Sequence, residues 1–177
     1  MRVVFIILIA LVSIVVLLLI VAAFVKKEYE VRREILINQP SRAVFDYVRH
    51  VKNQDNYSVW VMADPKMKKD YSGVDGQVGF VYAWDSQDGK VGKGHQEITA
   101  IKEAEEVDLK VTFIKPFEGV GLTEMKTEPA GDGQTRVSWG MRGKSVYPMN
   151  ITNLFIDGIL GKDLEKSLIN LRTVLEK

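Results

Sequence analysis

The sequence of 177 residues holds two histidines, and one of them, His95, has a carboxylate two residues away in Glu97. Side chains two residues apart on a strand point to the same face of a sheet. An imidazole and a carboxylate facing a cavity would serve as acid and base on a bound carbonyl compound. The opposite face carries Gln96 and Ile98, which is more typical of a core, so the pattern favours a solvent-facing position for His95 and Glu97. Glu124 is a third candidate, either as a polar group inside a cavity or on an exposed face.

Other catalytic and metal-binding patterns are missing from the sequence. There is no G-x-S-x-G nucleophile motif, and His50 is expected to be a solvated residue at the end of a helix. The sequence has no cysteine and no H-E-x-x-H or H-x-H motif, so we expect no metal site and no cofactor. The glycines within 89–94 are spaced as in a hairpin turn and not as in a phosphate-binding loop.

The first 25 residues are far more apolar than the rest of the chain. Residues 3–25 contain 22 apolar residues and one serine, with no charge. A helix of this length reaches about 34 Å, enough to cross a hydrocarbon core of roughly 30 Å. We therefore expect a transmembrane anchor over residues 1–25, with a cleaved secretory signal as the alternative. Basic residues flank both ends, so the side of the membrane that the following domain occupies stays open.

The remaining residues, 26–177, have the composition of one soluble domain. Their 23 basic and 23 acidic residues balance. Nucleic-acid-binding proteins usually carry a basic excess that releases counterions from phosphates, so we expect no nucleic-acid partner. A body of this size buries enough surface to fold around its own core.

Periodicity predicts the order of secondary structure in this domain. Residues 28–38 alternate as a half-buried strand, and Pro40 and Ser41 begin a short helix with an apolar stripe. Period-two patterns separated by glycine and aspartate turns then predict six antiparallel strands, near 67–72, 78–85, 93–102, 106–115, 121–128 and 135–143. Leucines spaced by three and four residues predict a long amphipathic C-terminal helix. Gly158 and Gly161 near its start mark either a bend or a site of close packing against the sheet.

Four sequence segments resemble a known superfamily. They are NQPSRAVFDYV at 38–48, KPFEG at 115–119, GDGQTRVSWGMRG at 131–143 and GKDLEKSLINLRTVLEK at 161–177. Together with the element order, they resemble the polyketide-cyclase-like branch of the START and birch-pollen-allergen superfamily (SRPBCC) over residues 27–177. The resemblance implies an α+β helix-grip fold, in which a curved antiparallel sheet of about seven strands wraps around the C-terminal helix. In that fold the sheet and helix enclose an apolar cavity for lipids, polyketides or other hydrophobic molecules.

Aromatic and methionine side chains are the candidates for the cavity lining that the resemblance implies. Val137, Trp139 and Met141 share one face of their strand, which makes Trp139 and Met141 the leading candidates. The other candidates lie on segments that the resemblance places around the cavity: Trp60, Tyr82, Trp84, Phe113, Met149 and Phe155. For each of them, ordinary core packing is the alternative.

The sequence thus favours a membrane-anchored domain, residues 26–177, that binds a hydrophobic small molecule or lipid. A cyclase or dehydratase acting on a polycarbonyl substrate is a second hypothesis, and it requires His95, Glu97 or Glu124 to face the cavity. A third is a protein-interaction module whose groove receives a partner segment. No catalytic motif decides between them.

Overall fold

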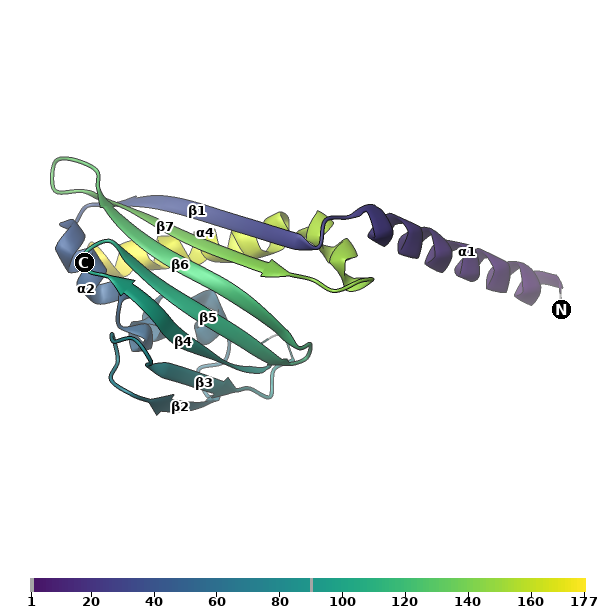
Figure 1. Ribbon diagram of the computed structural model, residues 1–177, viewed down its shortest axis with the longest axis horizontal. Coiled ribbons are helices and arrows are strands. Elements are labelled where there is room, and N and C mark those ends of the chain that lie inside the picture. Colours follow the sequence, from purple (N-terminus) through teal and green to yellow (C-terminus); the bar gives the residue numbers. More distant parts are fainter. Residues whose placement is uncertain (1, 90) are drawn as a thin grey trace.

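The computed structural model, which describes residues 2–89 and 91–177, is a curved sheet around a long helix, with a second helix projecting away (Figure 1). The chain begins with helix α1 (Arg2–Phe24), strand β1 (Glu28–Ile37) and helix α2 (Ser41–Val48). Two short helices follow, η1 (Val51–Asn56) and α3 (Val59–Ala63). The other strands are β2 (Lys68–Ser72), β3 (Val81–Asp85), β4 (Lys93–Lys102), β5 (Glu106–Lys115), β6 (Gly119–Pro129) and β7 (Thr135–Lys144). The chain ends with η2 (Met149–Leu154) and α4 (Ile156–Leu175).

The sheet has seven antiparallel strands in the order β1-β7-β6-β5-β4-β3-β2. The strands after β1 are joined in sequence as hairpins, and β1 closes the order by pairing with β7. Alternation along β5 shows the two faces, because Val107, Leu109 and Val111 are buried whereas Lys110 is exposed. The predicted strand set and helix-grip arrangement are therefore confirmed.

Helix α4 packs its leucine stripe against the inner face of the sheet. Leu164, Leu168 and Leu171 are buried in one core with residues of β1, β6 and β7. The helix runs without interruption from Ile156 to Leu175, so Gly158 and Gly161 do not break it. Close packing is the correct alternative at Gly161, where an added Cβ would overlap the guanidinium of Arg33 on β1.

The hairpin turns follow the predicted glycine and aspartate chemistry. Gly131, Asp132 and Gly133 all have positive φ between β6 and β7, a conformation that glycine adopts without steric cost. In the predicted hairpin between β3 and β4, Gly92 has a φ of +65° and donates its backbone N–H to Asp88 O. This confirms the turn interpretation for that glycine-rich segment.

Helix α1 is apolar and exposed along its length, and it is held at its C-terminal end by two asparagines. Asn150 donates from Nδ2 to the carbonyl oxygens of Ala22 at 2.6 Å and Val25 at 2.8 Å. Asn153 donates to the next carbonyls, those of Lys26 and Lys27, at 3.0 Å each. Among the described residues, α1 is the one helix long and apolar enough to cross a membrane, although a signal sequence would pass the same criterion.

Candidate functional site

A cavity of about 870 Å³ lies between the inner face of the sheet, α4 and the short helices. The sheet lines it with inward side chains of β3 to β7, including Val111 and Thr123, and α4 lines it with Leu160. Alternation positions these side chains, since every second residue of a strand faces the same side. Most of the wall is apolar, which is typical of sites for small hydrophobic ligands.

Seven of the eight predicted lining residues border this cavity: Trp60, Tyr82, Trp84, Phe113, Trp139, Met141 and Met149. Phe155 does not lie among them, because it precedes the first turn of α4 with its side chain 66% exposed. The three tryptophans of the chain all border the cavity. Tryptophan fluorescence is therefore a probe of this space.

Aromatic contacts fix Trp139 at the centre of one wall. Its ring meets those of Tyr57 and Trp60 edge-on, with each centroid 5.8 Å away. Its indole Nε1 donates to Thr123 Oγ1 at 2.9 Å, and that hydroxyl donates to Gly140 O at 2.7 Å. The indole is thus fully hydrogen-bonded within the protein and presents apolar surface to the cavity.

Two polar side chains of the cavity wall, Gln54 and Gln96, were not predicted as site residues. Gln96 donates from Nε2 to Gln54 Oε1 at 2.8 Å, and both side chains are buried. Tyr82 lies directly opposite Gln96 on the neighbouring strand. Burial raises the pKa of its hydroxyl, which has no hydrogen-bond partner within residues 2–89 and 91–177. Alternation along β4 places Gln96 with Ile98 on the inner face and was the sequence signal for Gln96, whereas Gln54 lies in a short helix without such a signal.

The cavity opens at the end of the domain from which α1 emerges. The exposed lining residues all belong to two segments, the β5–β6 turn (residues 115–120) and the β7–η2 region (residues 144–152). Both segments carry large apolar side chains at the opening. Phe117 is 71% exposed and Val146 is 73% exposed. The mouth is therefore bordered by large apolar side chains, and the exposed Lys115, Glu118 and Lys144 lie among them.

The three acid–base candidates lie outside the cavity. His95 and Glu97 alternate with the buried Gln96 and Ile98 along β4, which places them on the outer face of the sheet. Glu124 alternates with the buried Thr123 in the same way on β6. These positions remove the geometric basis of the acid–base hypothesis that was built on them.

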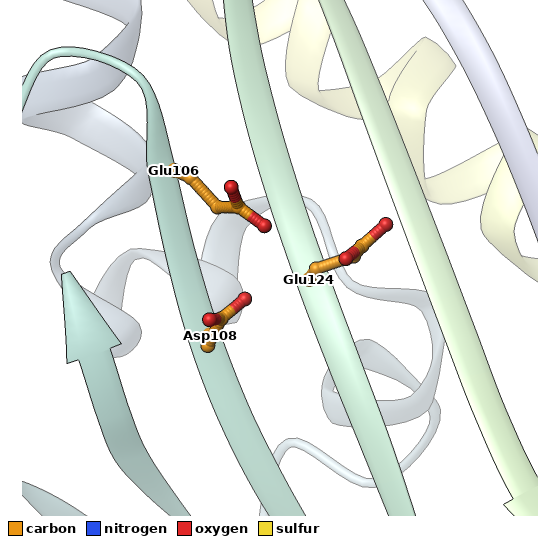
Figure 2. Close-up of side chains that lie close together, drawn as sticks. All are labelled: Glu106, Asp108 and Glu124. Atoms are coloured by element: carbon orange, nitrogen blue, oxygen red, sulfur yellow. The ribbon is translucent and has the colours of Figure 1, made fainter. Parts of the chain in front are cut away.

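Glu124 instead belongs to a carboxylate cluster with Glu106 and Asp108, whose side chains converge across β5 and β6 (Figure 2). One oxygen of each lies within 4.8 Å of the others, a spacing that a divalent cation with oxygen ligands could use. Two basic side chains already lie there. Arg32 donates to Glu124, and Lys126 Nζ lies 3.5 Å from Glu106 and 3.6 Å from Glu124. These ion pairs offset most of the negative charge that would attract a cation.

Burial is the main cause that raises the pKa of Glu106, and repulsion from Asp108 adds to it. Lys126 acts in the opposite direction without cancelling the shift. Asp108 and Glu124 of the cluster line a polar hollow of about 350 Å³, which shares Thr123 and Met141 with the cavity lining but none of the exposed residues at the mouth. The geometry is that of an ion-pair network across neighbouring strands.

Comparison with known proteins identifies a family that matches this chain. Residues 28–176 match the family described as polyketide cyclase / dehydrase and lipid transport. None of the curated proteins matches the chain.

Solved structures share the fold at low sequence identity. Norcoclaurine synthase from Thalictrum flavum superposes with a TM-score of 0.64 at 9% identity, over 85% of this chain and 87% of that one. Major latex-like protein 151 from Panax ginseng gives 0.57 at 16%, over 84% and 97%. A protein from Thermobifida fusca gives 0.60 at 14%, over 81% and 90%. Such identities establish the fold alone, but the family match spans most of the chain and confirms the resemblance seen in the sequence. The protein belongs to the polyketide cyclase / dehydrase and lipid transport family.

Proposed function

We propose that this protein is a membrane-anchored binder of a hydrophobic small molecule or lipid, which it holds in the helix-grip cavity. The observation that carries the proposal is the cavity of about 870 Å³ with its aromatic and aliphatic wall. Removing apolar ligand surface from water is favourable by roughly 25 cal/mol per Å². A cavity of this size and lining therefore supports binding without any covalent chemistry.

The proposal treats α1 as a single-pass anchor. Its 23 residues are long enough to cross a bilayer, and its exposed side chains are almost all apolar. Within the described residues, the domain contacts this surface over the last turns of α1, where Ala22 is buried beside η2 and the Leu19 carbonyl accepts from the Tyr147 hydroxyl. The anchor keeps the cavity close to a bilayer, where hydrophobic molecules concentrate.

The cavity can be tested with cis-parinaric acid, a fluorescent fatty acid that accepts energy from tryptophan. The full chain is purified in detergent and titrated with the probe while tryptophan emission is followed. We expect saturable quenching with one probe per chain, because Trp60, Trp84 and Trp139 all border the cavity.

A variant whose cavity is filled by larger side chains provides the comparison with the parent protein. The double variant Val111→Phe/Leu160→Phe adds bulk from the sheet wall and the α4 wall, and should abolish the saturable quenching. Leu122→Phe/Ile169→Phe makes the same kind of change at two exposed apolar positions, each 43% exposed, and should bind as the parent does. Identical titrations of the parent and the filled variant would show that the probe does not enter the cavity, and would sink the proposal.

A further inference from the structure

We propose that the mouth of the cavity rests in the surface of the bilayer, so that the ligand enters from the membrane without crossing water. This inference deepens the proposed function and rests on it. It commits to one partner for the exposed apolar side chains around the mouth, namely a lipid surface.

The first observation is an apolar rim at one end of the domain. Seven large apolar side chains there are at least 47% exposed. This rim consists of Phe117, Val120, Val146, Tyr147, Met149, Leu154 and Phe155. These residues come from the β5–β6 turn, the start of β6, the β7–η2 loop, η2 and the residue before α4, at the end of the domain where the cavity opens.

The second observation is that α1 leaves the domain beside this rim (Figure 1). Ser145 donates its backbone N–H to the carbonyl of Lys27 at 2.8 Å, three residues after α1 ends. Val146, the next residue, is therefore at the level where an anchored chain emerges from the bilayer. The β6–β7 turn lies at the opposite end of the domain.

The third observation places part of the rim alongside the helix itself. The Tyr147 hydroxyl donates to the carbonyl of Leu19 at 3.4 Å. Leu19 precedes the end of α1 at Phe24 by five residues, or about 7 Å along the helix axis. If α1 spans the bilayer, Tyr147 must lie at the depth of the headgroups, where tyrosine is enriched in membrane proteins.

These contacts favour a lipid surface over a protein partner. The asparagine hydrogen bonds fix the direction of α1 relative to the mouth, so insertion of α1 brings the rim to the bilayer without further rearrangement. A lipid surface also accepts a rim built from separate loops, because it does not require a complementary shape.

Nitroxide labels test the depth of the rim. The chain has no cysteine, so a single introduced cysteine gives one labelled site in the full protein. We would label Phe117→Cys and Val146→Cys on the rim, Val12→Cys on α1, and Arg136→Cys near the far end of β7. The chains are placed in phosphatidylcholine vesicles, and power saturation compares collisions with oxygen and with a water-soluble nickel chelate.

Labels on the rim should favour oxygen, as the label on α1 does, whereas the label at Arg136 should favour the nickel chelate. If the rim labels behave like Arg136 while the α1 label lies in the bilayer, the inference is overturned and the anchor stands. If the α1 label also contacts the nickel chelate, the anchor in the proposed function is wrong and the inference falls with it.

Ligand delivery gives a second, independent readout. Leu154→Asp/Phe155→Asp places two charges on the rim at positions that do not line the cavity. Transfer of cis-parinaric acid from vesicles should slow about tenfold or more, because two apolar contacts with the bilayer are lost. Binding in detergent should stay as in the parent. The control Leu122→Asp/Ile169→Asp should transfer normally, and equal rates for both double variants would overturn the inference.

Discussion

Replacing Asn150 should release α1 from the domain without unfolding either part. The Asn150 side chain is completely buried and makes two short hydrogen bonds, to Ala22 O and Val25 O. Asn150→Leu keeps the approximate volume and removes both donors, which leaves the buried Ala22 carbonyl with one partner fewer. At about 1 kcal/mol for each hydrogen bond, the docked position of α1 loses about 2 kcal/mol, or a factor of about 30 in the docked population.

Distances between two spin labels measure this change. Cysteines introduced at Ser13 on α1 and Arg136 on β7 would lie roughly 50 Å apart, from the rise of the helix, the connecting residues 25–27 and the strand. The parent should give one narrow distance distribution, and Asn150→Leu a broad one. Asn150→Asp should broaden it further, because a carboxylate would face two carbonyl oxygens.

Asn56→Leu is the matched control, since that exposed amide donates to Tyr47 Oη far from α1. Its distance distribution should match that of the parent. A narrow distribution for Asn150→Leu would refute the reasoning, because it would mean that packing around Ala22 and the hydrogen bonds of Asn153 and Tyr147 hold the helix without Asn150.

Three further predictions concern the domain and are checked by thermal unfolding. Glu106→Gln should raise the Tm at pH 7. Burial raises the pKa of Glu106, which means that its charged form destabilises the folded state. The gain in Tm should disappear below about pH 4, where Glu106 is protonated in both the folded and the unfolded state. Tyr57→Phe and Tyr82→Phe remove buried hydroxyls that have no partner in the described residues, and each should leave stability unchanged or raise it by up to about 1 kcal/mol; a clear loss in either would reveal an unrecognised partner. Gly158→Ala should stabilise α4 by about 0.5–1 kcal/mol because its Cβ meets open space. Gly161→Ala should gain less, because its Cβ displaces the Arg33 guanidinium; equal effects would contradict the packing described for Gly161.

The sheet and α4 could be predicted because their signals are local. Alternation of Val107, Leu109 and Val111 with polar residues is enough to place β5 and its two faces. The leucine stripe likewise identifies the face of α4 that is buried, as Leu164 and Leu168 show. Each signal is contained in a few consecutive residues, so no knowledge of distant contacts was needed.

The cavity could be predicted only in part, because a sequence pattern identifies the inward face of a strand but does not show which residues of that face border a cavity. Trp139 was assigned correctly to the inner face by its alternation, but Phe155 precedes a helix whose rotation depends on its packing against the sheet. Gln54 lies in a short 3₁₀ helix and meets Gln96 across 42 residues of chain. Asn150 reaches α1 across more than 120 residues. Such contacts depend on the tertiary arrangement and cannot be predicted from a short sequence pattern.

The position of Glu124 shows how strand register decides between a cavity group and a structural one. In the register of the sheet, Asp108, Glu124, Gly140 and Arg32 form one row across four strands. Gly140 has no side chain, so Arg32 passes over it to reach Glu124, and an added Cβ there would lie 3.3 Å from Glu124 Cγ. The glycine alone does not predict this contact between Arg32 and Glu124, which depends on the register of the four strands. Because that ion pair lies along the outer face, the charge of Glu124 belongs to the ion-pair network of the sheet and is not presented to the cavity.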